Sequence, residues 1–129
     1  MSKRLILDID DTISFTASGD YKNASLNQEI VNVIKRYKSL GFEIVFSTAR
    51  NMRTYKGNVG KINANTLPII IDWLEENGIP YDEVYTGKPW CGFEGFYVDD
   101  KAIRPKEFIT NSYEEIMELL EKDKLEPTT

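Results

Sequence analysis

The chain has 129 residues, a net charge of −5 and no histidine. This length suits one ordinary domain with a sizeable core, and the acidic balance argues against a general nucleic-acid binder. No apolar stretch approaches the roughly 20 residues that a membrane helix needs. Without histidine, any proton transfer must be carried by Asp, Glu, Lys, Tyr or Cys side chains.

Two features of the sequence concern the cellular compartment. The chain runs from Met-Ser-Lys-Arg straight into an apolar strand, without the longer apolar region of a secretory signal. Cys91 is the single cysteine, so an internal disulfide is excluded. We therefore expect a cytoplasmic protein with no membrane partner and no nucleic-acid partner.

Short apolar runs alternate along the chain with amphipathic segments. The predicted strands are Arg4–Leu7, Glu43–Ser47, Asp82–Tyr85 and Gly95–Val98. The predicted helices begin near Asn27, near Thr66 with Pro68 in the first turn, and at the capping box that starts with Ser112. Between the second strand and the second helix, residues Arg50–Thr66 are predicted to form a long loop.

This alternation predicts the α/β class, as a Rossmann-like three-layer α/β/α sandwich with a mainly parallel sheet. We expect residues 1–122 to form a single domain and residues 123–129 to be a frayed tail. A second domain would have to fit between the first two strands or after the second one. Neither gap is long enough.

Polar side chains that suit phosphate chemistry follow the end of each predicted strand. They are Asp8 and Asp10, Thr48, Lys88, and Asp99 with Asp100. Because ligands of parallel sheets bind beyond the carboxyl ends of the strands, we expect these groups to meet at one edge. The carboxylates suit Mg²⁺, the usual divalent ion beside phosphate. A threonine hydroxyl can donate a hydrogen bond to a phosphoryl oxygen, and a lysine can neutralise its charge.

In order and spacing these residues resemble the four motifs of the haloacid-dehalogenase-like superfamily of phosphatases, and the resemblance spans nearly the whole chain. The sequence also resembles a bacterial family of capsular-polysaccharide biosynthesis phosphatases. The segments that carry this narrower resemblance are residues 47–55, 57–63, 87–92 and 97–100. The superfamily resemblance implies a haloacid-dehalogenase-like core. Members of the superfamily usually carry a cap domain, but neither gap in this chain is long enough for one, so we expect a core without a cap.

The superfamily resemblance also implies roles for the motif residues. Asp8 would attack phosphorus and form an aspartyl-phosphate. Asp10 would protonate the leaving oxygen and then activate water, and together with Asp8 it would bind Mg²⁺. Thr48 and Lys88 would bind the phosphoryl group. Asp100 would ligate the metal directly, and Asp99 would support it through water or through Lys88.

The predicted loop from Arg50 to Thr66 is basic and contains no acid. Its cations are Arg50, Arg53, Lys56 and Lys61. It is either a solvated loop or a substrate-binding loop that recognises an anionic molecule. Trp90 would add an apolar wall. With the capsule resemblance, this favours a small phosphorylated carbohydrate, polyol or amino alcohol as the substrate.

Other functions remain compatible with part of the pattern. Phosphoryl transfer to an acceptor other than water needs the same groups. A signalling receiver domain also pairs acids after its first strand, but Thr48-Ala49-Arg50 occupies the place of its phospho-acceptor. A non-catalytic phosphate sensor would not need every acid intact. A cysteine phosphatase needs an arginine soon after Cys91, and none follows. Without a cap, the site is open to large substrates or covered by a neighbouring subunit, so we expect a homo-oligomer.

Overall fold

The computed structural model describes residues 2–128 of the chain. These residues form two compact units, residues 2–90 and residues 91–128, which are described one after the other. Among residues 2–128, no helix combines the length and the apolar character needed to cross a membrane.

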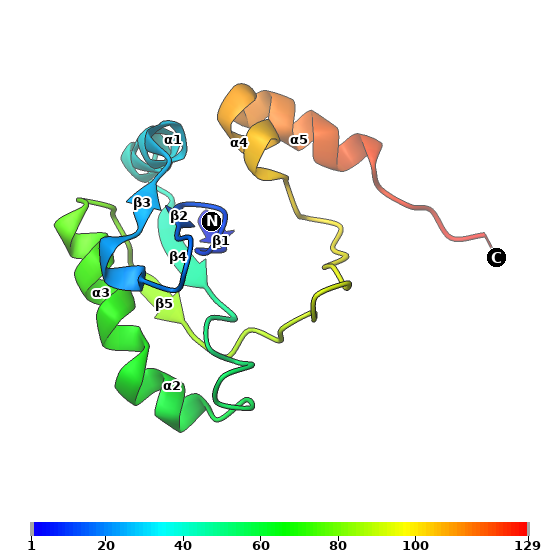
Figure 1. Ribbon diagram of the computed structural model, residues 1–129. Helices are drawn as coiled ribbons and strands as arrows, with labels where there is room; N and C mark the ends of the chain where they lie inside the picture. Colours follow the sequence, from blue (N-terminus) through cyan, green and yellow to red (C-terminus); the bar gives the residue numbers. More distant parts are fainter. Residues whose placement is uncertain (1, 129) are drawn as a thin grey trace. The chain divides into compact units, whose positions relative to one another are not determined.

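The first unit is built on a parallel three-stranded sheet in the order β1-β4-β5 (Figure 1). The strands are β1 (Arg4–Leu7), β4 (Glu43–Ser47) and β5 (Glu83–Tyr85). Parallel pairing is in register, with Ile6 opposite Val45 and Phe46 opposite Val84. The predicted parallel sheet is thus confirmed for these strands, and the third strand begins one residue later than predicted.

A small antiparallel hairpin follows β1 in a mostly polar segment for which the sequence predicts no strand. It consists of β2 (Ser14–Phe15) and β3 (Ser25–Leu26), and a short 3-10 helix, η1 (Tyr21–Asn23), lies in the connection. The indole N–H of the buried Trp73 donates a hydrogen bond of 3.0 Å to the Ala24 carbonyl. This bond ties the hairpin connection to the helix that carries Trp73.

Helix α1 (Gln28–Ser39) begins as the sequence predicts, because the Asn27 side chain accepts from the Ile30 amide at 3.0 Å. The predicted apolar face is buried, with Ile30 and Ile34 almost fully enclosed. After the helix, Gly41 adopts a φ of 92°, a left-handed conformation that favours glycine and ends the helix.

The prediction of an unbroken loop over Arg50–Thr66 is wrong in its second half. Helix α2 (Val59–Asn65) forms there and is followed directly by α3 (Leu67–Glu76). The Asn58 side chain caps α2 by accepting from the Lys61 amide at 3.1 Å. The helix buries only Ile62, which is too little apolar periodicity to be recognised in the sequence.

The second unit holds helices α4 (Pro105–Thr110) and α5 (Tyr113–Lys122). The predicted capping box of α5 is present, since Ser112 Oγ accepts from the Glu115 amide and Glu115 accepts from the Ser112 amide. The predicted strand at Gly95–Val98 is absent from the described structure. A strand needs a hydrogen-bonded neighbour, and the described residues offer this segment no pairing.

Candidate active site

Asp8 directly follows β1 and forms an ion pair with Lys88. The distance from Lys88 Nζ to Asp8 Oδ1 is 3.7 Å, and both side chains are partly exposed. Burial raises the pKa of Asp8 above its ordinary value, while Lys88 acts in the opposite direction. Asp8 is therefore a partly desolvated carboxylate held next to a cation, which is the setting expected of an attacking group at a phosphate site.

Asp10 lies two residues further on and is held by Arg50. The guanidinium makes two hydrogen bonds, Nε to Oδ2 at 3.1 Å and Nη2 to Oδ1 at 2.9 Å. The Arg50 side chain is only 2% exposed, whereas that of Asp10 is 32% exposed. The pair therefore fixes a carboxyl group that solvent can still reach. The predicted contact of Arg50 with substrate stays a prediction, because its donors meet Asp10 here.

Thr48 follows β4 and is buried at the same edge of the sheet. Its hydroxyl oxygen accepts from the Arg50 amide at 3.0 Å, which leaves the hydroxyl proton as a donor for another oxygen. Its backbone N–H donates to Tyr85, and its carbonyl accepts from the Lys88 amide at 3.2 Å. These backbone bonds tie the loop after β4 to the loop after β5, so that Thr48, Lys88 and Asp8 belong to one site.

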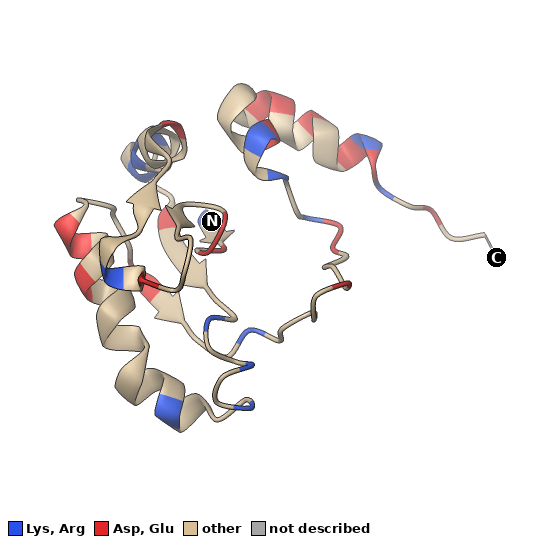
Figure 2. Ribbon diagram, in the orientation of Figure 1, with Lys and Arg blue, Asp and Glu red and all other residues tan. Residues whose placement is uncertain are grey.

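The remaining cations of the basic segment lie on the exposed surface next to this edge. Arg53, Lys56 and Lys61 are exposed, and Figure 2 shows the segment between β4 and α3 free of acidic colour. The start of α2 packs close to Gly87, where an added Cβ would lie 3.1 Å from Val59. A positive surface therefore begins beside Lys88.

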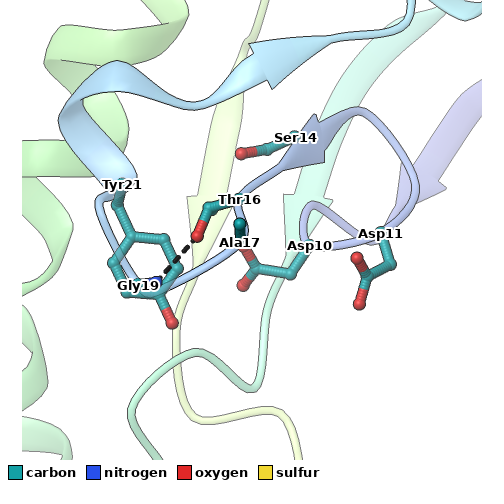
Figure 3. Close-up of a pocket in the computed structure, with 7 residues that line it drawn as sticks. All are labelled: Asp10, Asp11, Ser14, Thr16, Ala17, Gly19 and Tyr21. Atoms are coloured by element: carbon teal, nitrogen blue, oxygen red, sulfur yellow. Dashed lines mark hydrogen bonds between the residues drawn. The ribbon is translucent and has the colours of Figure 1, made fainter.

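A cavity of about 210 Å³ opens beside Asp10 (Figure 3). Seven residues of the β1 loop and the hairpin line it, namely Asp10, Asp11, Ser14, Thr16, Ala17, Gly19 and Tyr21. Among residues 2–128, the hydroxyl of Ser14 finds no hydrogen-bond partner. The cavity thus combines two carboxylates with three hydroxyl groups and has room for a small polar molecule.

Three of the predicted site residues lie at or beyond the end of the first unit. Trp90 is its last residue and is partly exposed. Asp99 and Asp100 belong to the second unit, where Asp99 accepts a hydrogen bond from the Lys101 amide at 2.9 Å. Their metal-binding roles stay predictions.

The first unit offers carboxylate oxygens that suit Mg²⁺. Asp8 offers a carboxylate that is 39% exposed, and the nearby charge of Asp10 disfavours its ionised form. A divalent cation would offset both the desolvation and the repulsion. Among residues 2–128, no three His, Cys, Asp or Glu side chains form a ready-made cluster. The oxygen donors at Asp8 and Asp10 therefore fit the ion but need a further ligand or water.

Sequence reasoning missed one aromatic residue of the site. The ring of Tyr21 lies against the Arg50 guanidinium, with the central carbon 4.0 Å from the ring centre. Tyr21 is separated from Arg50 by β3, α1 and β4, and no local pattern links the two. The hairpin brings them together, and its mostly polar sequence does not predict strands.

Comparison with known proteins agrees with this geometry. The family model described as haloacid dehalogenase-like hydrolase matches residues 5–128. A crystal structure of a protein from Vibrio cholerae has a TM-score of 0.92 and 54% sequence identity, covering 95% of this chain and 99% of that one. No curated protein matches the chain. Since the family match runs from β1 past α5, the chain belongs to the haloacid dehalogenase-like hydrolases.

Proposed function

We propose that this hydrolase is a Mg²⁺-dependent phosphatase that hydrolyses a small phosphomonoester through an aspartyl-phosphate. One observation carries the proposal: Asp8 at the end of β1 lies 3.7 Å from Lys88, in a site that also holds Thr48 and Asp10. A carboxylate is repelled by a phosphate dianion unless nearby cations balance the charge. Lys88 supplies one such cation.

The reaction is a two-step displacement. Asp8 Oδ attacks phosphorus, the bond to the leaving oxygen breaks, and Asp10 gives its proton to that oxygen. In the second step Asp10 takes a proton from a water molecule that attacks phosphorus. The bond to Asp8 then breaks, which restores the carboxylate and releases inorganic phosphate. In both steps Thr48 and Lys88 hold the phosphoryl oxygens.

The metal would be held by the Asp8 carboxylate, the Asp10 carbonyl and an acid of the Asp99-Asp100 pair, with Asp100 as the direct ligand. When bound, Mg²⁺ supplies positive charge that stabilises the phosphoryl oxygens. All of these donors are oxygen atoms, which is the preference of that ion.

The substrate we infer is a phosphorylated carbohydrate, polyol or amino alcohol used in capsule or surface-polysaccharide synthesis in the cytoplasm. The exposed cations Arg53, Lys56 and Lys61 support an anionic substrate, and Trp90 would contact its organic part. The cavity beside Asp10 has the size and hydroxyl content for a small polyol leaving group.

Phosphate release from a panel of sugar, glycerol-type and amino-alcohol phosphates tests this function, with Mg²⁺ and with EDTA. We expect turnover that needs the metal and that is lost in Asp8→Asn. Turnover that survives in Asp8→Asn would remove the assigned nucleophile. Phosphate that appears on an added alcohol instead of in solution would favour a transferase. A phosphoprotein that persists for minutes would favour a receiver.

The homo-oligomer is a further part of this proposal, because a site without a cap can be covered by a second subunit. Light scattering during chromatography measures the mass in solution. A monomer that is fully active on a small phosphate ester would contradict this part and leave the phosphatase reaction intact.

A further inference from the structure

The carboxyl group of Asp10 is held at both oxygens by one buried side chain. Arg50 donates from Nε and from Nη2, at 3.1 and 2.9 Å. This two-point contact fixes both the position and the rotation of the carboxyl plane, which a single hydrogen bond would not do. Because each carboxyl oxygen carries two lone pairs, each keeps a site for a proton or a water molecule.

Arg50 itself is fixed from two further directions. Its backbone N–H donates to Thr48 Oγ1 at 3.0 Å, which sets the start of the side chain. Its guanidinium lies 4.0 Å from the centre of the Tyr21 ring, a cation–π contact that covers one face of the group. The side chain is 2% exposed, so there is little room for another conformation.

The segment that contains Tyr21 is hydrogen-bonded to helix α3. Tyr21 begins the 3-10 helix η1, and the next turn of chain is tied to α3 by the bond from Trp73 to the Ala24 carbonyl. Tyr21 also lines the cavity beside Asp10 (Figure 3). Three separate elements thus converge on one carboxyl group: the hairpin through Tyr21, the β4 loop through Arg50, and β1 through Asp10 itself.

We propose that Arg50 and Tyr21 are positioning residues that aim the Asp10 carboxyl group at the leaving oxygen, so that Arg50 acts through Asp10 and does not bind the substrate phosphate. The proposal rests on the phosphatase function argued above and adds the residues that orient the carboxyl group of Asp10 for proton transfer. It also assigns the hairpin a part in catalysis.

A substrate anchor and a positioning residue differ in one measurable way. An anchor contributes equally whatever the leaving group, because it holds the phosphate. A residue that aims the general acid matters only when the leaving oxygen needs a proton. A nitrophenolate can leave without being protonated, whereas an alkoxide must be protonated as it leaves. A displacement of about 1 Å in the acid–base group can lower the rate about 10²-fold.

The test compares kcat/KM for glycerol 3-phosphate and for p-nitrophenyl phosphate, since kcat/KM reports the step in which the leaving group departs. In Arg50→Met we expect about a 10²-fold loss for glycerol 3-phosphate and less than about a 5-fold loss for p-nitrophenyl phosphate. Tyr21→Leu should show the same selective loss on a smaller scale. Tyr21→Phe should restore the wild-type ratio, because the ring face remains.

The control is Arg36→Met, which removes one positive charge from an exposed position of α1. It should leave both values of kcat/KM unchanged. Equal losses on the two substrates in Arg50→Met would overturn the proposal in favour of phosphate anchoring or general damage. An unchanged ratio with unchanged rates would overturn it as well.

A second measurement needs no activity and separates this proposal from the phosphatase function. Proton exchange at Arg50 Nε–H, followed by nitrogen-15 NMR, should be slow in the wild type. It should speed up at least about 10-fold in Tyr21→Leu and in Asp10→Asn, and stay slow in Arg36→Met. Fast exchange in the wild type would overturn the positioning contact. Slow exchange in a protein that hydrolyses neither ester would instead overturn the phosphatase function.

Discussion

Two ion pairs at this site involve carboxylates that are two residues apart in sequence, Asp8 and Asp10, and the two pairs differ in geometry and burial. Lys88 contacts Asp8 through one oxygen at 3.7 Å, and both side chains are partly open to solvent. Arg50 contacts Asp10 through both oxygens, and its side chain is buried. The first carboxylate meets its lysine at one oxygen and also has hydrogen bonds with the Ile9 backbone and the Thr12 side chain. The second is held at both oxygens by one arginine.

The difference suits the roles that we propose for the two residues. A nucleophile must change its bonding during the reaction, so a loose ion pair costs little to rearrange. An acid–base group must meet the leaving oxygen and later a water molecule at the same point, so precise orientation is valuable. The choice of lysine for one pair and arginine for the other matches this, because the planar guanidinium presents two N–H donors in a fixed geometry that fits the two oxygens of a carboxylate.

The largest expected effect comes from removing the nucleophile. Asp8→Asn should lower phosphate release by about 10⁴-fold or more, because no other group can form the covalent intermediate. Burial raises the pKa of Asp8, so its ionised form costs folding free energy at pH values above that raised pKa. Asp8→Asn should therefore unfold at a higher temperature than the wild type in EDTA at neutral pH. An equal or lower melting temperature would contradict the desolvated setting described for Asp8.

Removing Lys88, the cation that pairs with Asp8, should have the second largest effect on activity. Lys88→Met should lower kcat by about 10²- to 10³-fold, since one preorganised charge on the phosphoryl oxygens is lost. Lys35→Met, at an exposed position of α1, is the matched control and should leave kcat unchanged. Steady-state kinetics with saturating Mg²⁺ measure both variants. A Lys88→Met enzyme with wild-type kcat would mean that Lys88 only stabilises the fold.

The contact between Arg50 and Asp10 should contribute measurably to the free energy of unfolding. Asp10→Ala leaves the buried Arg50 guanidinium without its carboxylate, and an uncompensated buried charge costs about 3 kcal/mol. The double variant Asp10→Ala with Arg50→Met removes the charge as well and should recover part of that loss. Urea unfolding of the four proteins of this cycle gives the coupling energy. A double variant that is less stable than Asp10→Ala would contradict the account of a buried charge.

Much of this arrangement could be predicted from local sequence patterns. The apolar runs of β1 and β4 are short, bounded by polar residues and followed by Asp8 and Thr48, so the sequence predicts both strands and the sheet edge that holds the candidate site. Asn27 and Ser112 cap their helices with side chains of the types that are preferred at helix N-termini. Each of these features depends on residues within a few positions of one another.

The contacts that were not predicted join distant segments. The partnership of Arg50 with Asp10 and Tyr21 spans up to 40 residues, and the basic sequence around Arg50 suggested a substrate contact instead. Helix α2 has one buried residue, and the segment Gly95–Val98 has the composition of a strand but no paired neighbour. Local composition cannot reveal which of several charged residues is buried, because tertiary packing decides it.

The smallest expected effect concerns a third pair, Lys38 with Asp82, which serves as an exposed reference for the other two. Lys38 Nζ lies 2.8 Å from both Asp82 oxygens, and Asp82 also accepts from the Ile44 amide at 2.7 Å. These bonds lower the pKa of Asp82 below its ordinary value. A carboxyl group with a lowered pKa adds stability above the unfolded pKa of about 3.9 and loses it as the pH falls through the folded value.

Asp82→Asn should therefore be less stable than the wild type at pH 7. The difference should begin to shrink below about pH 4 and vanish once the pH has fallen through the lowered pKa of folded Asp82. Thermal unfolding from pH 7 to pH 3 measures it, with Asp72→Asn on α3 as the control acid. Because both partners are partly exposed and the pair is screened, 0.5 M salt should reduce the difference. The buried contact of Arg50 with Asp10 should resist the same salt. If salt weakened both pairs equally, burial would not be what separates the fixed pair from the exposed one.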